Sequence, residues 1–456
     1  MPADYRSRAS MERLSADLAS LHAAHLGVLR ARFDSALVAC GYRAVLISSG
    51  GLTPIFGDDQ DYPFRVNPWF KAWVPLTQAP DSFLYYEPGR TPVLLFHRPV
   101  DFWYMSADLP QSDWTRSIEV KPIADRKAAR TALPRELARI ACLGEPFAEA
   151  TAWGLACNPA DLVTRLEYDR AFKTPYELAC LRAANRLGAR AHLAAAHAFA
   201  GGASEREIEL AFLRASGSRE QDLPYNPIVA LNEHAAVLHY QRLDPLPPPT
   251  LHSLLIDAGV ASAGYGSDIT RTYSFADSEF AALIESFDAV QQALCAGVHA
   301  GVDWRDVHLT AHRLVAELLH EADITTCDAE EAVATGVSSV FLPHGLGHLL
   351  GLQVHDAGGL LRSPEGGEIP RPPGHPFLRL TRVLEEGFVV TMEPGIYFIE
   401  PLLDEARADS RAGRINWARV EQLRQFGGIR IEDDLAVTSS GAENLTREAF
   451  RFAAGS

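Results

Sequence analysis

The stretch Phe341-Leu-Pro-His344-Gly-Leu-Gly-His348-Leu-Leu-Gly-Leu-Gln-Val-His355-Asp356 carries three histidines with three glycines between them. Each glycine inside a helix costs about 1 kcal/mol relative to alanine, so this density of glycine argues against a helical zinc motif. We expect an irregular or extended backbone that lets the imidazoles reach one centre. Carboxylates from elsewhere in the chain would then complete a metal site.

Composition sets the broad class of the protein. At 456 residues the chain exceeds what one hydrophobic core usually organises, so two domains are expected. A net charge of −16 argues against a phosphate-binding surface, and no nucleic acid partner is expected. No run of residues approaches the roughly 20 apolar positions that span a bilayer, so no membrane partner is expected either.

The cysteines and the N-terminal residues bear on the compartment. The six cysteines are scattered and no pair has Cys-x-x-Cys spacing, which favours reduced thiols over a zinc or redox motif. Residues 1–40 contain arginines and acids throughout and lack the apolar core of a signal peptide. We therefore expect a cytoplasmic protein.

The sequence predicts a smaller α/β domain over residues 1–165 and a larger domain over residues 166–456. Short apolar runs at 44–48 and 92–96 suit buried strands of the first domain. The turn-rich segment 57–73, which includes Asp58 and Asp59, suits a cleft cover or a subunit contact, and an ordinary surface loop fits equally well. A helix over 176–200 opens the second domain, and Ser204 and Glu207 form a capping box for the next helix.

A helix predicted over 304–323 carries three further histidines, His308, His312 and His320. His308 and His312 have i, i+4 spacing, but Leu309 stands where the helical zinc motif has glutamate. We interpret these histidines as ordinary helix residues rather than ligands. Residues 362–376 suit a long loop, and residues 402–425 lack apolar periodicity at their start, so both segments are interpreted as insertions.

Two aspartates are expected on one face of a hairpin. An apolar strand ends at Asp257, and a second strand over 264–272, which carries Asp268, follows a turn predicted near 261–264. That arrangement would place the two aspartates roughly opposite each other, with Cβ atoms about 5 Å apart. Two carboxylates so close are unfavourable unless a cation lies between them, which predicts a metal site.

Two glutamates complete the acidic set. Glu393 ends an apolar strand just before a predicted Pro-Gly turn, and Glu432 shares one face of a further strand with Arg430. A structural Glu–Arg ion pair is the alternative for that last strand. Two Asp, two Glu and one His without sulfur suit two divalent cations about 3.5–4 Å apart. Oxygen-rich ligands favour Mn²⁺, with Co²⁺ or Zn²⁺ as competent substitutes.

The ordered set Asp257, Asp268, His348, Glu393 and Glu432 resembles the pita-bread metallopeptidases, which include methionine aminopeptidase, aminopeptidase P and prolidase. The wider contexts Asn232-Glu-His-Ala-Ala-Val-Leu-His239-Tyr240, Pro343-His-Gly-Leu-Gly-His348 and Gln353-Val-His355-Asp356 look like the bacterial Xaa-Pro dipeptidase branch. The resemblance covers nearly the whole chain. It implies an α/β (α+β) protein whose second domain is a pita-bread domain, with a curved antiparallel sheet covered by helices.

The resemblance also implies roles for individual residues. Asp257 would bind one metal, Asp268 and Glu432 would bridge the pair, and His348 and Glu393 would complete the other site. Glu393 would also take the proton of the attacking water, as the hydroxide that bridges the metals cleaves the imide bond. Among the remaining residues, His239 and His355 would stabilise the intermediate, His344 and Arg430 would hold the proline carboxylate, and Tyr225 would line the site.

Several functions share this site. The resemblance implies hydrolysis of Xaa-Pro dipeptides by a homodimer, whose N-terminal domain supplies a loop near Asp58 to the neighbouring subunit. The alternatives among enzymes are aminopeptidase P-like cleavage of longer Xaa-Pro peptides and hydrolysis of phosphotriesters by an organophosphorus acid anhydrolase. A binding module of the same fold is disfavoured, because such relatives lose ligands and all five are present here.

Overall fold

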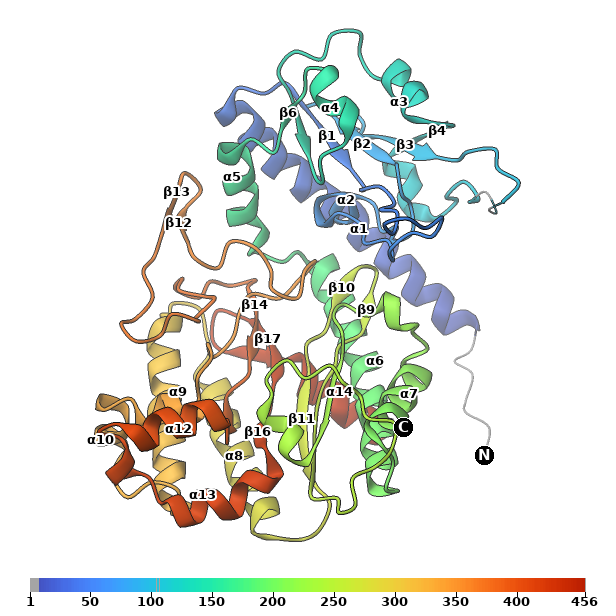
Figure 1. Cartoon of the computed structure of the whole chain (residues 1–456). Helices are drawn as coiled ribbons and strands as arrows, with labels where there is room; N and C mark the ends of the chain where they lie inside the picture. The colour runs from blue at the N-terminus through green and yellow to red at the C-terminus, as the bar shows by residue number, and fades with distance from the viewer. Residues whose placement is uncertain (1–7, 104, 106, 456) are drawn as a thin grey trace. The chain divides into compact units, whose positions relative to one another are not determined.

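A computed structural model describes residues 8–103, 105 and 107–455 (Figure 1). The expectation about a signal peptide in residues 1–40 therefore falls in part outside the described residues. The chain divides into two compact units. One holds the residues up to Arg170 with Thr174–Ala179 and Ser363–Gly366, and the other holds Ala171–Lys173, Cys180–Arg362 and Gly367–Ser456.

The N-terminal unit contains a six-stranded mixed sheet in the order β4-β3-β2-β1-β5-β6. Its strands are β1 (Ala44–Ser48), β2 (Phe83–Tyr86), β3 (Val93–His97), β4 (Glu119–Ile123), β5 (Ile140–Leu143) and β6 (Ala156–Cys157). Its helices are α1 (Arg8–Cys40), α2 (Pro68–Trp73), α3 (Arg126–Ala132), α4 (Ala148–Ala152) and α5 (Ala160–Arg170). Strand β1 is buried along its whole length, as its unbroken apolar run predicts.

Short antiparallel strands form the centre of the C-terminal unit. One sheet has the order β11-β8-β7, another β14-β17-β18, and β15 pairs with β16. The strands are β7 (Ile228–Leu231), β8 (Ser253–Asp257), β9 (Ala261–Ser262), β10 (Tyr265–Gly266), β11 (Thr270–Ser274), β14 (Val389–Met392), β15 (Gly395–Tyr397), β16 (Gly428–Arg430), β17 (Asp433–Val437) and β18 (Ala442–Asn444). A β-bridge between Thr270 and Glu432 joins the first sheet to the β16–β17 segment.

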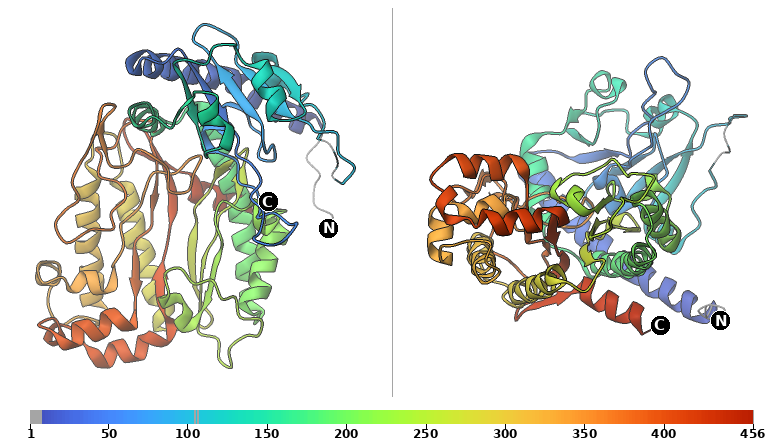
Figure 2. Two further views of the ribbon diagram at one scale, coloured as in Figure 1. Left: turned by 45° about the horizontal axis from the view of Figure 1, so that its top comes forward. Right: turned by 60° about the horizontal axis from the view of Figure 1, so that its bottom comes forward.

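Helices lie along one side of these strands. In the right-hand view of Figure 2, the helices coloured from green to yellow-orange form a curved row beside the strands. The helices after Arg170 are α6 (Pro175–Ala200), α7 (Glu205–Ser216), α8 (Glu279–Ala296), α9 (Trp304–Glu321), α10 (Ala329–Ala334), α11 (Val337–Phe341), α12 (Glu400–Ala408), α13 (Trp417–Leu423) and α14 (Leu445–Ala454). The capping box predicted at Ser204 and Glu207 is present at the start of α7.

Helix α9 illustrates how the sequence produces this layer. Asp303 caps its first turn by accepting a hydrogen bond from the backbone N–H of Arg305. Its buried side chains recur every four residues, which places them on one face of the helix. None of the helices in the described ranges is both long enough and apolar enough to cross a membrane.

The structure corrects three local expectations. The hairpin turn is present, with Ser262 opposite Tyr265, but Asp257 lies opposite Thr270 rather than Asp268. The aspartates are therefore diagonal neighbours on the same face. The chain does not reverse after Glu393, because β15 continues beyond it and pairs with β16. The segment 402–425, which was interpreted as an insertion, is largely helical. Its helices α12 and α13 bury Leu403 and Val420 in a core cluster.

The segment 362–376 is also more regular than predicted. It contains a two-stranded pairing between β12 (Leu361–Ser363) and β13 (Gly366–Glu368), followed by residues without regular structure. The histidine-rich stretch after α11 has no helix, as its glycines predict. Gly347 lies so close to the backbone carbonyl of Thr391 that a Cβ atom there would overlap it.

Candidate active site

The four carboxylates are carried at the ends of strands. Asp257 closes β8, Asp268 stands two residues before β11, and Glu393 follows β14 directly. Glu432 occupies the break between β16 and β17, where its backbone N–H donates to the carbonyl of Thr270. The ends of strands from different sheets thus place these acidic side chains in one site.

Three predicted ligands come together most closely. Oxygen atoms of Asp268 and Glu432 and a ring nitrogen of His348 all lie within 4.8 Å of one another. All three side chains are buried. Glu393 joins them, because its Oε1 lies 3.5 Å from Nε2 of His348. This grouping is the arrangement that a metal site requires.

His348 presents a lone pair to this group. Its Nδ1 lies 3.0 Å from the carbonyl oxygen of Leu349, and a carbonyl can only accept, so Nδ1 carries the hydrogen. Its Nε2 then faces Oδ2 of Asp268 and Oε1 of Glu393, each at 3.5 Å. An imidazole lone pair surrounded by carboxylate oxygens needs either a proton or a metal cation.

The electrostatics of the site point the same way. Burial, reinforced by the neighbouring carboxylates, raises the pKa of Glu432 well above its usual value and that of Glu393 to about 7. Burial alone would lower the pKa of His348, but its contact with Asp268 and the charge of Glu393 raise it to about 9. Burial would raise the pKa of Asp268, yet His348 lowers it. The carboxylates hold more negative charge than His348 balances, and oxygen donors with one imidazole fit divalent cations.

Asp257 is held from two sides. The hydroxyl of Tyr225 donates to Oδ1 at 2.7 Å, and Nη2 of Arg430 donates to Oδ2 at 2.7 Å. Burial raises the pKa of Asp257, while the charge of Arg430 opposes that rise. Two fixed hydrogen bonds orient both carboxylate oxygens, as is common for residues that bind metals.

Arg430 is buried in a network of its own. Nε donates to Oγ1 of Thr270 at 3.2 Å, and Nη1 donates to the hydroxyl of Tyr397 at 2.9 Å. Thr270 in turn donates to Oε2 of Glu432 at 2.6 Å. The guanidinium therefore supports Asp257 directly and Glu432 through Thr270.

His344 continues this network. Its Nδ1 lies 2.9 Å from the carbonyl of Gly345 and its Nε2 lies 2.9 Å from the hydroxyl of Tyr397. Because the carbonyl must accept, Nδ1 donates and Nε2 accepts from Tyr397, whose oxygen accepts from Arg430. Burial lowers the pKa of His344 to about 4, so its imidazole is neutral at pH 7. Sequence analysis missed Tyr397, although it stands on the strand that follows Glu393.

The other two predicted histidines are more exposed. The ring of His355 packs edge-on against that of His348, with centroids 4.4 Å apart. Burial lowers the pKa of His355 to about 4, and the positive forms of His348 and His239 add to the effect. His239 is exposed and lies near enough to lower the pKa of His344 as well. Both side chains are exposed, and that of His355 packs against His348.

Comparisons with known proteins identify the family of the chain. Residues 20–168 match the family described as "Xaa-Pro dipeptidase, N-terminal domain", and residues 179–439 match "Metallopeptidase family M24". A protein named Xaa-Pro dipeptidase from Xanthomonas axonopodis pv. citri is 50% identical over 434 residues, which cover 95% of this chain and 98% of the relative. One of the same name from Stenotrophomonas maltophilia is 47% identical over 440 residues, with 96% and 99% covered.

Among solved structures, aminopeptidase P from E. coli with the inhibitor Pro-Leu superposes with a TM-score of 0.69. The two share 24% identity, and the match covers 94% of this chain and 99% of the other. That likeness concerns the fold, and with the family match it confirms the predicted pita-bread domain. The chain belongs to metallopeptidase family M24.

Proposed function

We propose that this metallopeptidase hydrolyses the imide bond of Xaa-Pro dipeptides and releases proline. The observation that carries the proposal is the Nε2 lone pair of His348, which faces the carboxylates of Asp268 and Glu393. The names of the relatives that match over nearly their whole length support the choice of substrate. Two divalent cations would be held by the strand-end carboxylates and His348, namely Asp257, Asp268, His348, Glu393 and Glu432.

When bound, the metals would supply Lewis acidity at the scissile carbonyl and would make water acidic enough to act as a nucleophile near neutral pH. Mn²⁺ is the favoured ion because four of the five donors are carboxylates, and Co²⁺ or Zn²⁺ would substitute. Glu393 accepts the proton of the attacking water.

The remaining residues bind and orient the dipeptide. His239 and His355, which lie at the open side of the carboxylates, donate hydrogen bonds to the oxygen that becomes negative during the reaction. Tyr225 lines the site and fixes Asp257. Arg430, with the neutral His344 beside it, supplies positive charge for the carboxylate of the proline product.

A metal-reconstitution assay tests this function. Protein stripped with a chelator would be reloaded separately with Mn²⁺, Co²⁺ and Zn²⁺ and assayed on an Xaa-Pro dipeptide, an Xaa-Pro-Yaa tripeptide and a phosphotriester. We expect activity to depend on metal and to be greatest on the dipeptide. Preference for the tripeptide would assign the chain to aminopeptidase P-like cleavage, and preference for the phosphotriester to an anhydrolase.

The role of Arg430 can be separated from its support of Asp257. In Arg430→Ala, Asp257 loses a charged partner, so kcat should fall for all substrates. If Arg430 also binds the proline carboxylate, KM should rise about 10–100-fold for dipeptides and much less for Xaa-Pro amides. Equal changes in KM on both substrates would leave Arg430 only its role in positioning Asp257.

The proposal includes a cytoplasmic homodimer. Reduced cysteines support the compartment, since all six are free thiols. The segment around Asp58 and Asp59 supports a subunit contact, because it is exposed and carries the fully exposed Phe56. Light scattering of the intact protein and of Phe56→Ser tests the contact. A dimer that Phe56→Ser weakens is expected, and an unchanged dimer would place the interface elsewhere.

A further inference from the structure

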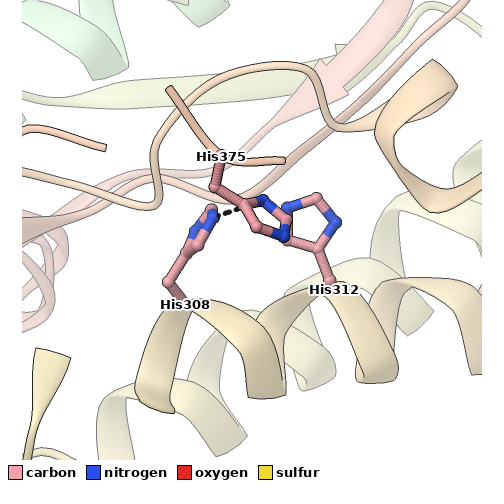
Figure 3. Close-up of side chains that lie close together, drawn as sticks. All are labelled: His308, His312 and His375. Atoms are coloured by element: carbon pink, nitrogen blue, oxygen red, sulfur yellow. Dashed lines mark hydrogen bonds between the residues drawn. The ribbon is translucent and has the colours of Figure 1, made fainter. Parts of the chain in front are cut away.

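Three histidines from distant parts of the chain meet beside α9. His308 and His312 project from α9, one turn apart, and His375 reaches them from the segment between β13 and β14 (Figure 3). Nε2 of His308 lies 2.9 Å from Nδ1 of His375. The three ring centroids are 4.5–4.7 Å apart, and one nitrogen of each ring lies within 4.8 Å of the others. None of the five ligands proposed for the carboxylate site belongs to this cluster.

The cluster leaves polar atoms unsatisfied. The side chains of His308 and His312 are each 1% exposed. Among the described residues, neither Nδ1 of His308 nor Nε2 of His312 has a hydrogen-bond partner. A buried polar atom without a partner costs roughly 1–3 kcal/mol, so Nε2 of His312 calls for a ligand in this cluster. Nδ1 of His308 is not the atom that such a ligand would meet, because His308 faces His375 through Nε2.

The histidines are in the protonation state that binds metals. Burial, with smaller effects from the neighbouring histidines, lowers the pKa of His308 to about 2 and that of His312 to about 3. Burial lowers the pKa of His375 as well. All three imidazoles are therefore neutral at pH 7, and a metal need not displace a proton from them.

We propose that His308, His312 and His375 bind one divalent transition-metal ion of the kind that prefers imidazole, with Zn²⁺ as the leading choice. Two nitrogens bound to one tetrahedral zinc at about 2.0–2.1 Å lie roughly 3.3 Å apart. The separation of 2.9 Å between His308 and His375 needs to widen by only a few tenths of an ångström. The hydrogen bond between these two rings is then replaced by two bonds to the metal.

The surroundings suit such a site. Nδ1 of His312 lies 3.1 Å from Oγ of Ser338, which holds the ring and leaves Nε2 directed at the cluster. His375 is partly exposed, so an ion can enter and water can occupy a fourth position. Sulfur and carboxylate are missing from the set, which favours Zn²⁺ over Mn²⁺ or Mg²⁺.

A second cluster of possible ligands has a different explanation. Glu205, His234 and Asp244 also lie close together. The Glu205 oxygens, however, already accept hydrogen bonds from the backbone N–H groups of Leu231 and Asp244. They also contact Nδ1 of His234 and the hydroxyl of Tyr240, both at 2.7 Å. That cluster is complete without a metal, whereas the three-histidine cluster is not.

The three-histidine site adjoins the active site. A Cβ atom at Gly345 would lie 2.8 Å from the carbonyl oxygen of Phe377, so the segment that carries His375 packs directly against the backbone next to His344. A metal bound by the three histidines would link the segment that carries His375 to α9. The ion therefore has a structural role next to the active site, and it takes no part in the hydrolysis.

Metal stoichiometry of the full-length protein tests the inference. Protein stripped of metal would be dialysed against micromolar Zn²⁺ and analysed for bound zinc, together with His375→Ala and the control His320→Ala. His320 lies exposed in the last turn of the same helix. His375→Ala should bind one equivalent less than the wild type, with affinity for that equivalent reduced at least about 100-fold. His320→Ala should match the wild type.

A second measurement distinguishes zinc lost from the three-histidine cluster from zinc lost from the carboxylate site. His348→Ala lowers metal binding there but leaves the three histidines intact, so Zn²⁺ should still raise its melting temperature. His348→Ala/His375→Ala should lose one further equivalent and most of that stabilisation. Equal stoichiometry and equal stabilisation with and without His375 would overturn the inference, whatever the activity of either protein. Because His375 is only partly buried, its replacement tests the site even if His308→Ala or His312→Ala fails to fold.

Discussion

The carboxylate centre and the three-histidine cluster lie in the same unit and differ in charge. The centre gathers four carboxylates around one imidazole, and an internal network that includes Arg430 restrains it. The cluster consists of three neutral rings held by one hydrogen bond between them and one to Ser338. The centre therefore needs cations to balance its charge, whereas the cluster would use one to satisfy Nε2 of His312.

This difference separates the two sites chemically. Oxygen-rich donors select hard cations such as Mn²⁺, and imidazoles select Zn²⁺ or related ions. The cluster is thus expected to take Zn²⁺ rather than Mn²⁺, whereas the centre would take Mn²⁺ and also accept Co²⁺ or Zn²⁺. Variants that change one site test whether metal binding at the other site changes.

The largest effect is expected from the carboxylate centre. His348→Ala or Glu393→Ala removes a metal ligand, and kcat should fall at least about 10³-fold. Circular dichroism should remain that of the wild type, because each side chain lies at the edge of a strand or in an irregular segment. Turnover near the wild-type rate in either variant would contradict the assignment of that residue.

Support for the centre can be weakened without touching a ligand. Asp433 follows Glu432 in the chain, is fully buried, and accepts hydrogen bonds from Arg271 and Arg447 at 2.7 and 2.8 Å. Arg447→Ala leaves it one arginine, and the free energy of unfolding should fall by about 3 kcal/mol. The exposed pair Arg313–Glu317 is the control, since Arg313→Ala should cost at most about 0.5 kcal/mol.

Urea denaturation of both variants measures these differences. The same loss in Arg447→Ala and Arg313→Ala would mean that the buried network adds nothing beyond a surface ion pair. Zinc binding at the three-histidine cluster should be unchanged in both.

The three-histidine cluster should make the stability of the protein depend on pH between about 7 and 5. An unfolded histidine binds a proton below about pH 6.5, while the folded His312 stays neutral until about pH 3. Above pH 6.5 the ring is neutral in both the folded and the unfolded state and adds no pH dependence, and stability is lost as the pH falls from 6.5 towards 3. By about pH 5 the metal-free wild type should lose roughly 2 kcal/mol that His312→Gln does not lose.

The free energies of unfolding of the wild type and of His312→Gln would be compared between about pH 7 and pH 5. If both fall equally, His312 is protonated in the folded state over that range. Denaturation must be measured with a chelator present, because bound zinc would keep the ring neutral.

The smallest effect is expected at Ser338. Ser338→Ala removes the hydroxyl that holds Nδ1 of His312, so zinc affinity at the cluster should fall about 10-fold. The metal-free protein should lose about 1 kcal/mol of stability. Competition with a chromophoric chelator measures the affinity, and Ser339→Ala provides a neighbouring control. An unchanged affinity would mean that the serine does not orient the ring.

Sequence reasoning predicted strand ends at Asp257 and Glu393 because each closes an apolar run, which is a local pattern. It placed Asp257 and Asp268 on one face but misjudged their register by two residues, since register depends on the turn and on pairing with β7. It also predicted a turn after Glu393, where Pro-Gly instead interrupts a strand that continues in another pair.

The three-histidine cluster could not be predicted from local patterns. His308 and His312 have metal-binding spacing, but no glutamate follows His308, so the local pattern does not predict that they bind a metal. Their third partner, His375, lies in an irregular segment whose path is set by tertiary packing against Gly345. A site whose members share no strand or motif becomes visible only when the fold is known.

The bridge between Thr270 and Glu432 has a consequence for synthesis of the protein. The ribosome makes β8 and β11 well before β16 and β17. Asp257 and Asp268 therefore lack Glu432 as a neighbour until β16 and β17 have emerged. The proposed metal centre can form in the nascent protein only after that point.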